Sequence, residues 1–195
     1  MNPILSRNAY FVKEHVGMFK AANNFDILDP ESGQIILECR EPKLGFFTKW
    51  FRFTKYKRYT PFAIEIRDST GEPVAYVRRN ASFFRSIVQV FDEKETPVGS
   101  FRQKLLSIGG KFEILDAEGN SGCMLKGSWS SWNFRFERDG VLLAQVSKKW
   151  AGIGKELFTS ADNYMLVIEA SVPSADPIRR LILAAVLCID MVLKE

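Results

Sequence analysis

Hydrophobic and polar residues alternate in short runs along most of this chain, and a turn divides each pair of runs. Five segments share the pattern: FDILDPESGQIILECR, FAIEIRDSTGEPVAYVRR, IVQVFDEKETPVGSFRQ, KFEILDAEGNSGCMLKG and FRFERDGVLLAQVSKK. Alternation with a period of two is typical of a β-strand with one buried face. Asp can hydrogen-bond its own turn backbone, and Gly tolerates positive φ angles. The pattern therefore predicts five antiparallel hairpins.

The spacing of the turns indicates how the hairpins are arranged. The turn aspartates are Asp29, Asp68, Asp92, Asp116 and Asp139, and the last four recur every 23 or 24 residues. That interval suits one hairpin plus one connection. Serial hairpins leave exposed sheet edges unless the sheet closes, so a closed barrel is favoured over an open sheet. No linker interrupts the series, and we expect residues 1–195 to form a single, mainly β domain.

The chain ends on its most apolar run, RRLILAAVLCIDMVLKE. Ser174 or Asp176 can cap a helix there, and Pro177 suits its first turn, which predicts a helix at about residues 175–193. A membrane span needs about 20 consecutive apolar residues. The charge-free stretch 181–189 is much shorter. We therefore expect a buried helix that fills the barrel, with Asp190 near one mouth in a structural ion pair.

Composition and charge add a mild preference for acidic partners. The chain has 195 residues, of which 46% are hydrophobic and 26% charged, and its formal net charge is +4. The sequence pI is about 9.0, which permits a phospholipid surface as a partner without requiring one. Cys39, Cys123 and Cys188 form no C-x-x-C motif, which favours a reducing cytoplasm. The N-terminus lacks the features of a signal peptide.

Catalytic chemistry has little support. His15 is the sole histidine, it lies in a segment predicted to be a strand, and the sequence implies no partner for it. The serines of SWSSWNF have no base at an inferable distance. Without His or Cys constellations, we predict that the protein is not an enzyme and needs no cofactor.

The segment VSKKWAGIGKELFTSADNY, followed by RRLILAAVLCIDMVLKE, resembles the phospholipid scramblase family. It is similar also to the LURP-one-related proteins of the tubby C-terminal-like superfamily. The matching residues are Ser147, Lys148, Trp150, Gly152, Glu156, Phe158, Thr159, Ala161, Asp162, Asn163, Tyr164, Ile189 and Asp190. The resemblance starts near Ala9 and implies a twelve-stranded antiparallel barrel around a central C-terminal helix. It also implies phospholipid scrambling as an activity.

The same resemblance draws attention to calcium. The proposed calcium segment of the family begins and ends with Asp, whereas Ser160 and Ser171 stand at those places here, and Asp162 and Asn163 alone match. Calcium prefers six to eight oxygen ligands, so two side chains before an apolar strand make a poor site. We expect Asp162 and Asn163 to shape a turn, with calcium as the weaker alternative.

The most unusual surface segment is 43–62, KLGFFTKWFRFTKYKRYTPF. It interleaves aromatic and basic residues and contains neither acid nor the cysteine cluster of eukaryotic scramblases. Basic side chains contribute about 1 kcal/mol each near an anionic lipid surface. Trp, Tyr and Phe can enter the interfacial zone beside them. The predicted lipid-binding residues are Lys49, Trp50, Arg52, Lys55, Lys57 and Arg58.

The functional hypothesis is a monomeric, cytoplasmic protein that binds anionic phospholipid or phosphoinositide headgroups peripherally on the membrane. For the segment 43–62, the alternative is a barrel strand with a solvated basic face. For the whole protein, the alternative is a soluble protein-interaction or regulatory module with no lipid activity. Single-stranded nucleic acid is a weaker candidate partner, since it also favours basic grooves with aromatic platforms.

Overall fold

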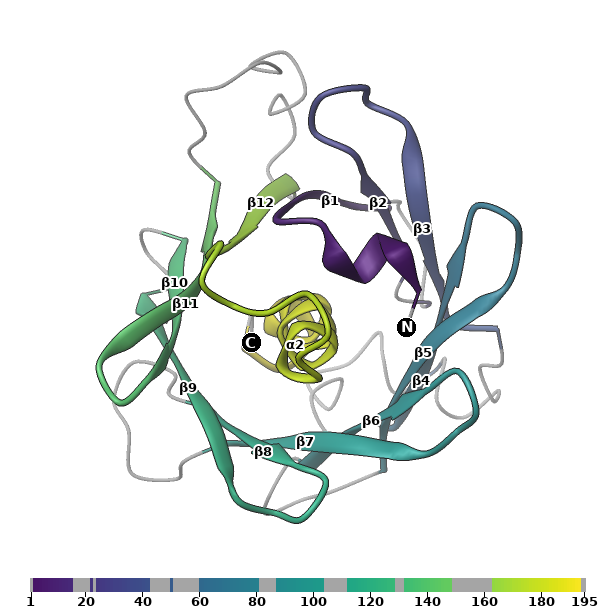
Figure 1. Ribbon diagram of the computed structural model, residues 1–195. Helices are drawn as coiled ribbons and strands as arrows, with labels where there is room; N and C mark the ends of the chain where they lie inside the picture. The colour runs from purple at the N-terminus through teal and green to yellow at the C-terminus, as the bar shows by residue number, and fades with distance from the viewer. Residues whose placement is uncertain are drawn as a thin grey trace.

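The computed structural model describes residues 2–15, 22, 24–42, 50, 60–80, 87–103, 112–128, 132–148 and 163–193. Its twelve strands pair in sequence order, and pairing of the first with the last closes an antiparallel barrel, as predicted (Figure 1). The strands are β1 Ala9–Glu14, β2 Phe25–Leu28, β3 Ile35–Arg40, β4 Phe62–Asp68, β5 Pro73–Arg79, β6 Ile87–Asp92, β7 Pro97–Gln103, β8 Phe112–Asp116, β9 Ser121–Ser128, β10 Asn133–Arg138, β11 Val141–Ser147 and β12 Asn163–Ile168.

All five predicted hairpins are confirmed, and the aspartates form their turns. The Asp68 carboxylate accepts hydrogen bonds from the backbone N–H groups of Thr70 and Glu72. Asp139 and Gly140 both have positive φ, which suits a two-residue hairpin turn whose twist matches the flanking strands. The turn chemistry visible in the sequence therefore sets the strand pairs.

The alternation of each strand sorts its residues between the barrel interior and the solvent. In β10, Phe134 and Phe136 are fully buried while Arg135 is exposed, as the period of two predicts. The seam between β1, β2 and β12 differs, because Phe11, Leu28 and Met165 make a second buried cluster on the opposite face from the main core. Strict alternation therefore fails where the barrel closes.

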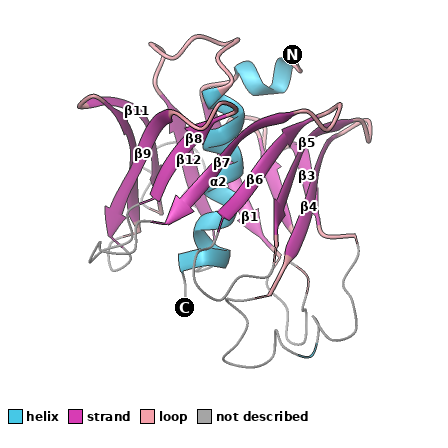
Figure 2. Ribbon diagram, turned by 90° about the horizontal axis from the view of Figure 1, so that it is seen from below, coloured by secondary structure: helices cyan, strands magenta, loops and turns pink. Residues whose placement is uncertain are grey.

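Helix α2, Ile178–Leu193, runs through the barrel along its axis (Figures 1 and 2). Every side chain from Ile178 to Ile189 is buried, which confirms the predicted central helix. The Asp176 carboxylate accepts a hydrogen bond from the Ile178 N–H at 2.9 Å, so Asp176 rather than Ser174 caps the helix. The side chain of Asp190 lies outside the described residues.

The buried Arg179 anchors the first turn of α2 through contacts that the sequence did not indicate. The Arg179 guanidinium donates to the carbonyl oxygens of Leu5, Arg7, Val172 and Pro173 and to the Asn8 side chain. These neutral acceptors replace the water that a buried cation loses. Arg179 thereby ties α2 to the N-terminal segment that contains the 3₁₀ helix η1, Pro3–Ser6.

Candidate functional site

The barrel has two rims that differ in the length of their connections. Connections of two to six residues join β2–β3, β4–β5, β6–β7, β8–β9 and β10–β11 at the end where α2 begins; we call this end the tight-turn rim. Connections of four to 21 residues join the remaining neighbours at the end where α2 terminates, which we call the long-connection rim. Antiparallel topology alone assigns each connection to its rim.

The charges of these connections have opposite signs. The connections of the tight-turn rim, together with residues 169–177 before α2, contain nine acidic residues and one lysine. Those of the long-connection rim contain thirteen basic residues and three acidic ones. The positive end of the α2 dipole lies at the tight-turn rim, where it favours the negative charge of the acidic residues.

The predicted lipid-binding segment belongs to the long-connection rim, because it leaves β3 after Arg40 and returns to the sheet at Phe62 in β4. Trp50 is described within it, and 67% of its surface is exposed. Lys49, Arg52, Lys55, Lys57 and Arg58 lie outside the described residues, so their role in lipid binding stays a prediction.

The return of this segment into the barrel is anchored by Arg79, at the end of β5. Its buried Nη2 donates to the Thr60 carbonyl oxygen at 2.7 Å. Its guanidinium carbon lies 4.8 Å from the centroid of the Phe62 ring, within the range of a cation–π contact. The chain therefore enters β4 at a point fixed from a neighbouring strand, a contact that sequence spacing does not reveal.

The departure of the segment from β3 is anchored by an ionic cluster. Arg40 Nη2 lies 2.6 Å from Asp26 Oδ1, and His15 Nε2 lies 2.6 Å from Asp26 Oδ2. Burial favours a raised pKa at Asp26, yet the hydrogen bonds from His15 and Arg40 outweigh it and hold that pKa below its usual value. The sequence implied no partner for His15; the structure supplies Asp26, because β1 and β2 pair in register.

An aromatic cluster lies further round the same rim, between β10, β11 and β12. Lys148 Nζ lies 3.6 Å from the Trp132 ring centroid, and Trp132 stacks on Tyr164 with the ring centroids 6.2 Å apart. No periodic signal marks this cluster in the sequence, since Trp132 and Tyr164 are 32 positions apart. It extends the combination of basic and aromatic side chains beyond the predicted segment.

Of the two calcium candidates, Asn163 belongs to the described residues and Asp162 does not. Asn163 is buried as the first residue of β12, opposite Lys13. Within the described ranges, no three His, Cys, Asp or Glu side chains gather in a way that could hold a metal ion.

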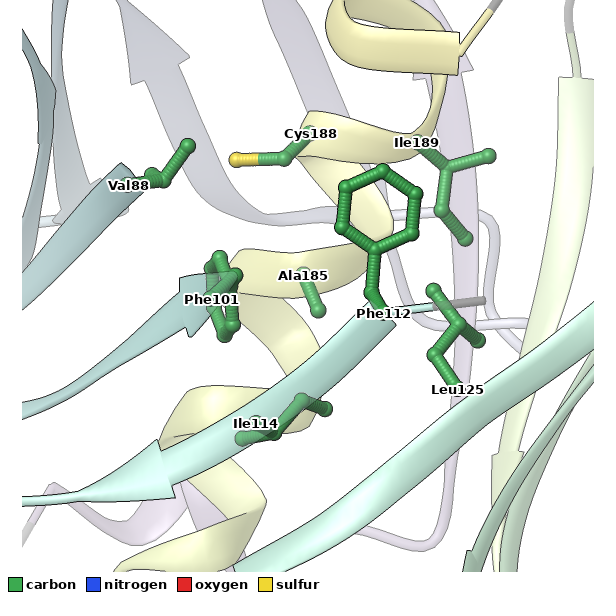
Figure 3. Close-up of a pocket in the computed structure, with 8 residues that line it drawn as sticks. All are labelled: Val88, Phe101, Phe112, Ile114, Leu125, Ala185, Cys188 and Ile189. Carbon is green, nitrogen blue, oxygen red and sulfur yellow. The ribbon is translucent and has the colours of Figure 1, made fainter. Parts of the chain in front are cut away.

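A cavity of about 20 Å³ lies between the last turns of α2 and the wall formed by β6 to β9 (Figure 3). Phe101, Phe112, Leu125 and Ile189 line it with carbon, and the Cys188 thiol borders it. A void this size would hold about one water, but an apolar lining keeps such cavities dry. We infer a packing defect, too small for a lipid chain.

The cysteines offer no reactive thiol. Burial raises the pKa of the Cys123 and Cys188 thiols to about 12 and raises that of Cys39 as well. A thiol reacts as its thiolate, so the folded barrel suppresses the chemistry of all three. Chemical labelling of these thiols would therefore report exposure of the barrel interior.

A closed barrel of twelve antiparallel strands around a C-terminal helix has the LURP-one/tubby-like fold, and the structure matches the X-ray structure of protein AT5G01750 from Arabidopsis thaliana. That match has a TM-score of 0.56 and 16% identity, and it covers 94% of this chain and 90% of the other. Among the described residues, no helix combines the length and apolarity needed to cross a bilayer.

The family is also clear. The scramblase family model matches residues 4–195, and the chain belongs to the scramblase family. It is similar to altered inheritance rate of mitochondria protein 25 of Saccharomyces cerevisiae, with 24% identity over 84% of this chain. The chain spans 57% of the length of that relative.

Proposed function

We propose that this protein binds anionic phospholipid headgroups peripherally, with its long-connection rim against the bilayer. The observation that carries the proposal is Trp50, a large aromatic side chain with two-thirds of its surface exposed in a segment that contains six basic residues and no acid. Such a segment combines electrostatic attraction with an aromatic side chain suited to the interface. Membership of the scramblase family supports a lipid partner.

The excess of basic residues in the connections of this rim supports the same orientation. An anionic surface attracts one end of the barrel and repels the other, so the molecule approaches with its axis near the membrane normal. The proposed contacts are Lys49, Arg52, Lys55, Lys57 and Arg58 on phosphates, with Trp50 inserted beside them. This is a binding role and requires no catalytic group.

Flotation with liposomes tests the proposal. We expect the protein to float with phosphoinositide-containing vesicles at low salt, and less at high salt or with neutral vesicles. Replacing Lys55, Lys57 and Arg58 with Glu should abolish flotation, whereas Trp50→Ala should weaken it and leave its salt dependence. Lys94→Glu, on the tight-turn rim, serves as the control and should float like the wild type. Absence of flotation under every condition would overturn the proposal and leave a protein-interaction module.

Scrambling would demand more than headgroup binding. Moving a headgroup across the bilayer needs a polar path through hydrocarbon. The described helix α2 is buried in its own barrel and supplies none. We propose that peripheral binding is the basic activity, and that scrambling by this chain would require α2 to leave the barrel.

Cys188 reports on such a release. We expect a maleimide reagent to leave Cys188 unlabelled in the presence of phosphoinositide vesicles, since the thiol stays buried and protonated. Cys39→Ser and Cys123→Ser together would leave it as the single thiol. Rapid labelling that depends on vesicles would contradict purely peripheral binding and make a scrambling assay the next experiment.

A further inference from the structure

The tight-turn rim contains a cleft that the lipid proposal does not use. It has a volume of about 440 Å³ and lies between the β6–β7 turn, the β8–β9 turn and the segment that enters α2. Asp92 and Glu93 line it from the first turn, Asp116 and Glu118 from the second, and Arg180 from α2. Four carboxylates and one guanidinium give this acidic cleft a net charge of −3.

Two of the four carboxylates of the acidic cleft, those of Asp92 and Asp116, are held in place by their own turns. Asp92 Oδ1 accepts from the backbone N–H groups of Lys94 and Thr96 at 2.9 and 2.8 Å. Asp116 Oδ1 accepts from the Asn120 N–H at 2.7 Å. Glu118 is exposed on the same turn as Asn120, and no described residue pairs with it. The cleft therefore presents two carboxylates at fixed positions and a third, that of Glu118, on an exposed side chain.

Arg180 is a second, independent feature of the cleft. Its side chain is only 10% exposed, and Nη2 lies 2.7 Å from Glu93 Oε2. Its Nε is buried and finds no hydrogen-bond acceptor among the described residues. A buried guanidinium N–H without an acceptor is costly, so a small shift of the Arg180 side chain toward an acceptor oxygen in the cleft would be stabilising.

These features select one class of occupant. A free anion would be repelled by the net charge, and a polyamine offers no acceptor to Arg180. A bilayer is disfavoured because further exposed acids lie on the same rim, such as Glu72 on the adjacent β4–β5 turn. A peptide carries backbone carbonyl oxygens together with Lys or Arg side chains. Pro97, Val98 and Pro177 add apolar lining for the aliphatic parts of those side chains.

We propose that the acidic cleft binds a basic, extended peptide segment of a partner protein, whose lysines or arginines face the carboxylates while a backbone carbonyl accepts a hydrogen bond from Arg180. The site lies at the opposite end of the barrel from the proposed membrane contact. The protein would therefore hold a basic partner on its outer end while its other end lies against a membrane. The peptide site does not depend on the lipid proposal, since the two share no residue.

Fluorescence anisotropy of the full chain tests the peptide site. The probe is a fluorescein-labelled octapeptide of alternating lysine and glycine, and its counterpart carries glutamate in place of lysine. We expect binding of the lysine peptide that weakens between 50 and 300 mM salt, and none of the glutamate peptide. Spermine, which carries positive charge but no carbonyl, should compete at least tenfold more weakly than an unlabelled tetralysine peptide of equal charge.

Matched variants locate the site. Glu118→Lys should weaken binding of the lysine peptide at least tenfold, and Glu31→Lys, the same charge change on the β2–β3 turn outside the cleft, should change it less than twofold. Both glutamates are exposed, so both variants should fold. Flotation with phosphoinositide vesicles should survive Glu118→Lys, which separates failure of this proposal from failure of the lipid proposal.

Three results would overturn the inference. One is no binding of the lysine peptide at 50 mM salt. Another is an equal loss in Glu118→Lys and Glu31→Lys, because binding would then follow the overall charge of the rim. The third is Glu118→Lys acting on flotation with neutral zwitterionic vesicles and not on the peptide, which would assign the cleft to a lipid headgroup.

Discussion

The two rims of this barrel share the same twelve strands but differ in the length and the charge of the connections that join them. At the tight-turn rim, short connections close each hairpin, and four of the five turn aspartates accept backbone hydrogen bonds. In these connections and residues 169–177, acids outnumber basic residues nine to one. At the long-connection rim, lengths reach 21 residues and basic residues outnumber acids thirteen to three. The short turns determine which strands pair. The long connections do not, so their sequences can be suited to binding.

The comparison separates stability from function. Changes to the hydrogen-bonded turn aspartates and along α2 should alter unfolding. Changes to exposed side chains, in the basic connections or at Glu118 of the acidic cleft, should alter binding with little effect on unfolding. Four predictions of stability follow from the contacts, in order of decreasing size.

Ala184→Asp should unfold the whole barrel, because α2 fills its core from one rim to the other. The Ala184 side chain is fully buried, and an unpaired carboxylate forced into the interior should cost at least about 3 kcal/mol of unfolding free energy. We expect an insoluble or unfolded protein by circular dichroism. The control is Ala117→Asp, the same substitution on an exposed turn. A folded, cooperatively unfolding Ala184→Asp protein would contradict the central helix.

Gly99→Ala should destabilise the barrel wall where it meets α2. A Cβ at Gly99 would lie 2.2 Å from the Leu115 carbonyl oxygen and 3.0 Å from Leu181 Cδ1, so backbone must move. We expect a loss of about 1–3 kcal/mol in urea unfolding. Gly122→Ala makes a looser contact, at 3.4 Å from Ile178 Cδ1, and should cost less. An equal cost at the two positions would contradict the close approach of β8 and α2 to Gly99.

Asp68→Ala should cost about 1 kcal/mol of unfolding free energy, since the N–H groups of Thr70 and Glu72 lose their acceptor. Lys55→Ala, in the basic segment, should change unfolding by less than about 0.5 kcal/mol and should weaken vesicle flotation. The pair of variants, measured by urea unfolding and by flotation, should give opposite results. If Lys55→Ala destabilised the fold more than Asp68→Ala, the division of labour between the rims would be wrong.

Lowering the pH should reduce the unfolding free energy, with a small contribution from each turn aspartate of the tight-turn rim. Backbone hydrogen bonds lower the pKa of Asp29, and the Thr70 hydroxyl does so for Asp68. At Asp92, burial opposes the shift, but the N–H groups of Thr96 and Lys94 outweigh it and lower the pKa. A depressed folded pKa stabilises the protein above the unfolded value of roughly 3.9, and that stability is lost as the pH falls below it.

The measurement is the urea midpoint between pH 6 and pH 2.5. We expect it to decline from about pH 5 downward. Asp68→Asn, which keeps a side-chain oxygen but cannot titrate, should flatten the decline. An increase in stability on acidification would contradict the lowered pKa values of these turn aspartates.

Much of the fold could be predicted because its signals are local. The alternation of FRFER and the turn dipeptide Asp139–Gly140 determine a hairpin within about ten residues. Asp176 and Pro177 predict the start of α2, and the short charge-free run 181–189 predicts its burial. Resemblance to the scramblase family supplied the number of strands, which periodicity alone had not determined.

The candidate sites were harder to predict, and for a physical reason. The segment 43–62 is conspicuous in the sequence, but its anchors carry no sequence signature. Arg79 reaches Thr60 from a neighbouring strand, and Asp26 pairs with Arg40 at the end of β3, where the connection begins. The pairing of Arg180 with Glu93 joins residues 87 positions apart. The apolar pattern of α2 indicated burial but could not indicate which charges would lie beside its first turn.

By itself, then, the sequence determined the strands, the turns and the central helix, because each depends on neighbours along the chain. It also determined that acidic and basic connections alternate along the chain. Only the tertiary structure decided that those connections collect at opposite ends of one barrel, and that two distant turns and the first turn of α2 enclose an acidic cleft. Closure of β1 on β12 brings residues 150 to 158 positions apart into register. No local pattern specifies which side chains such closure brings together.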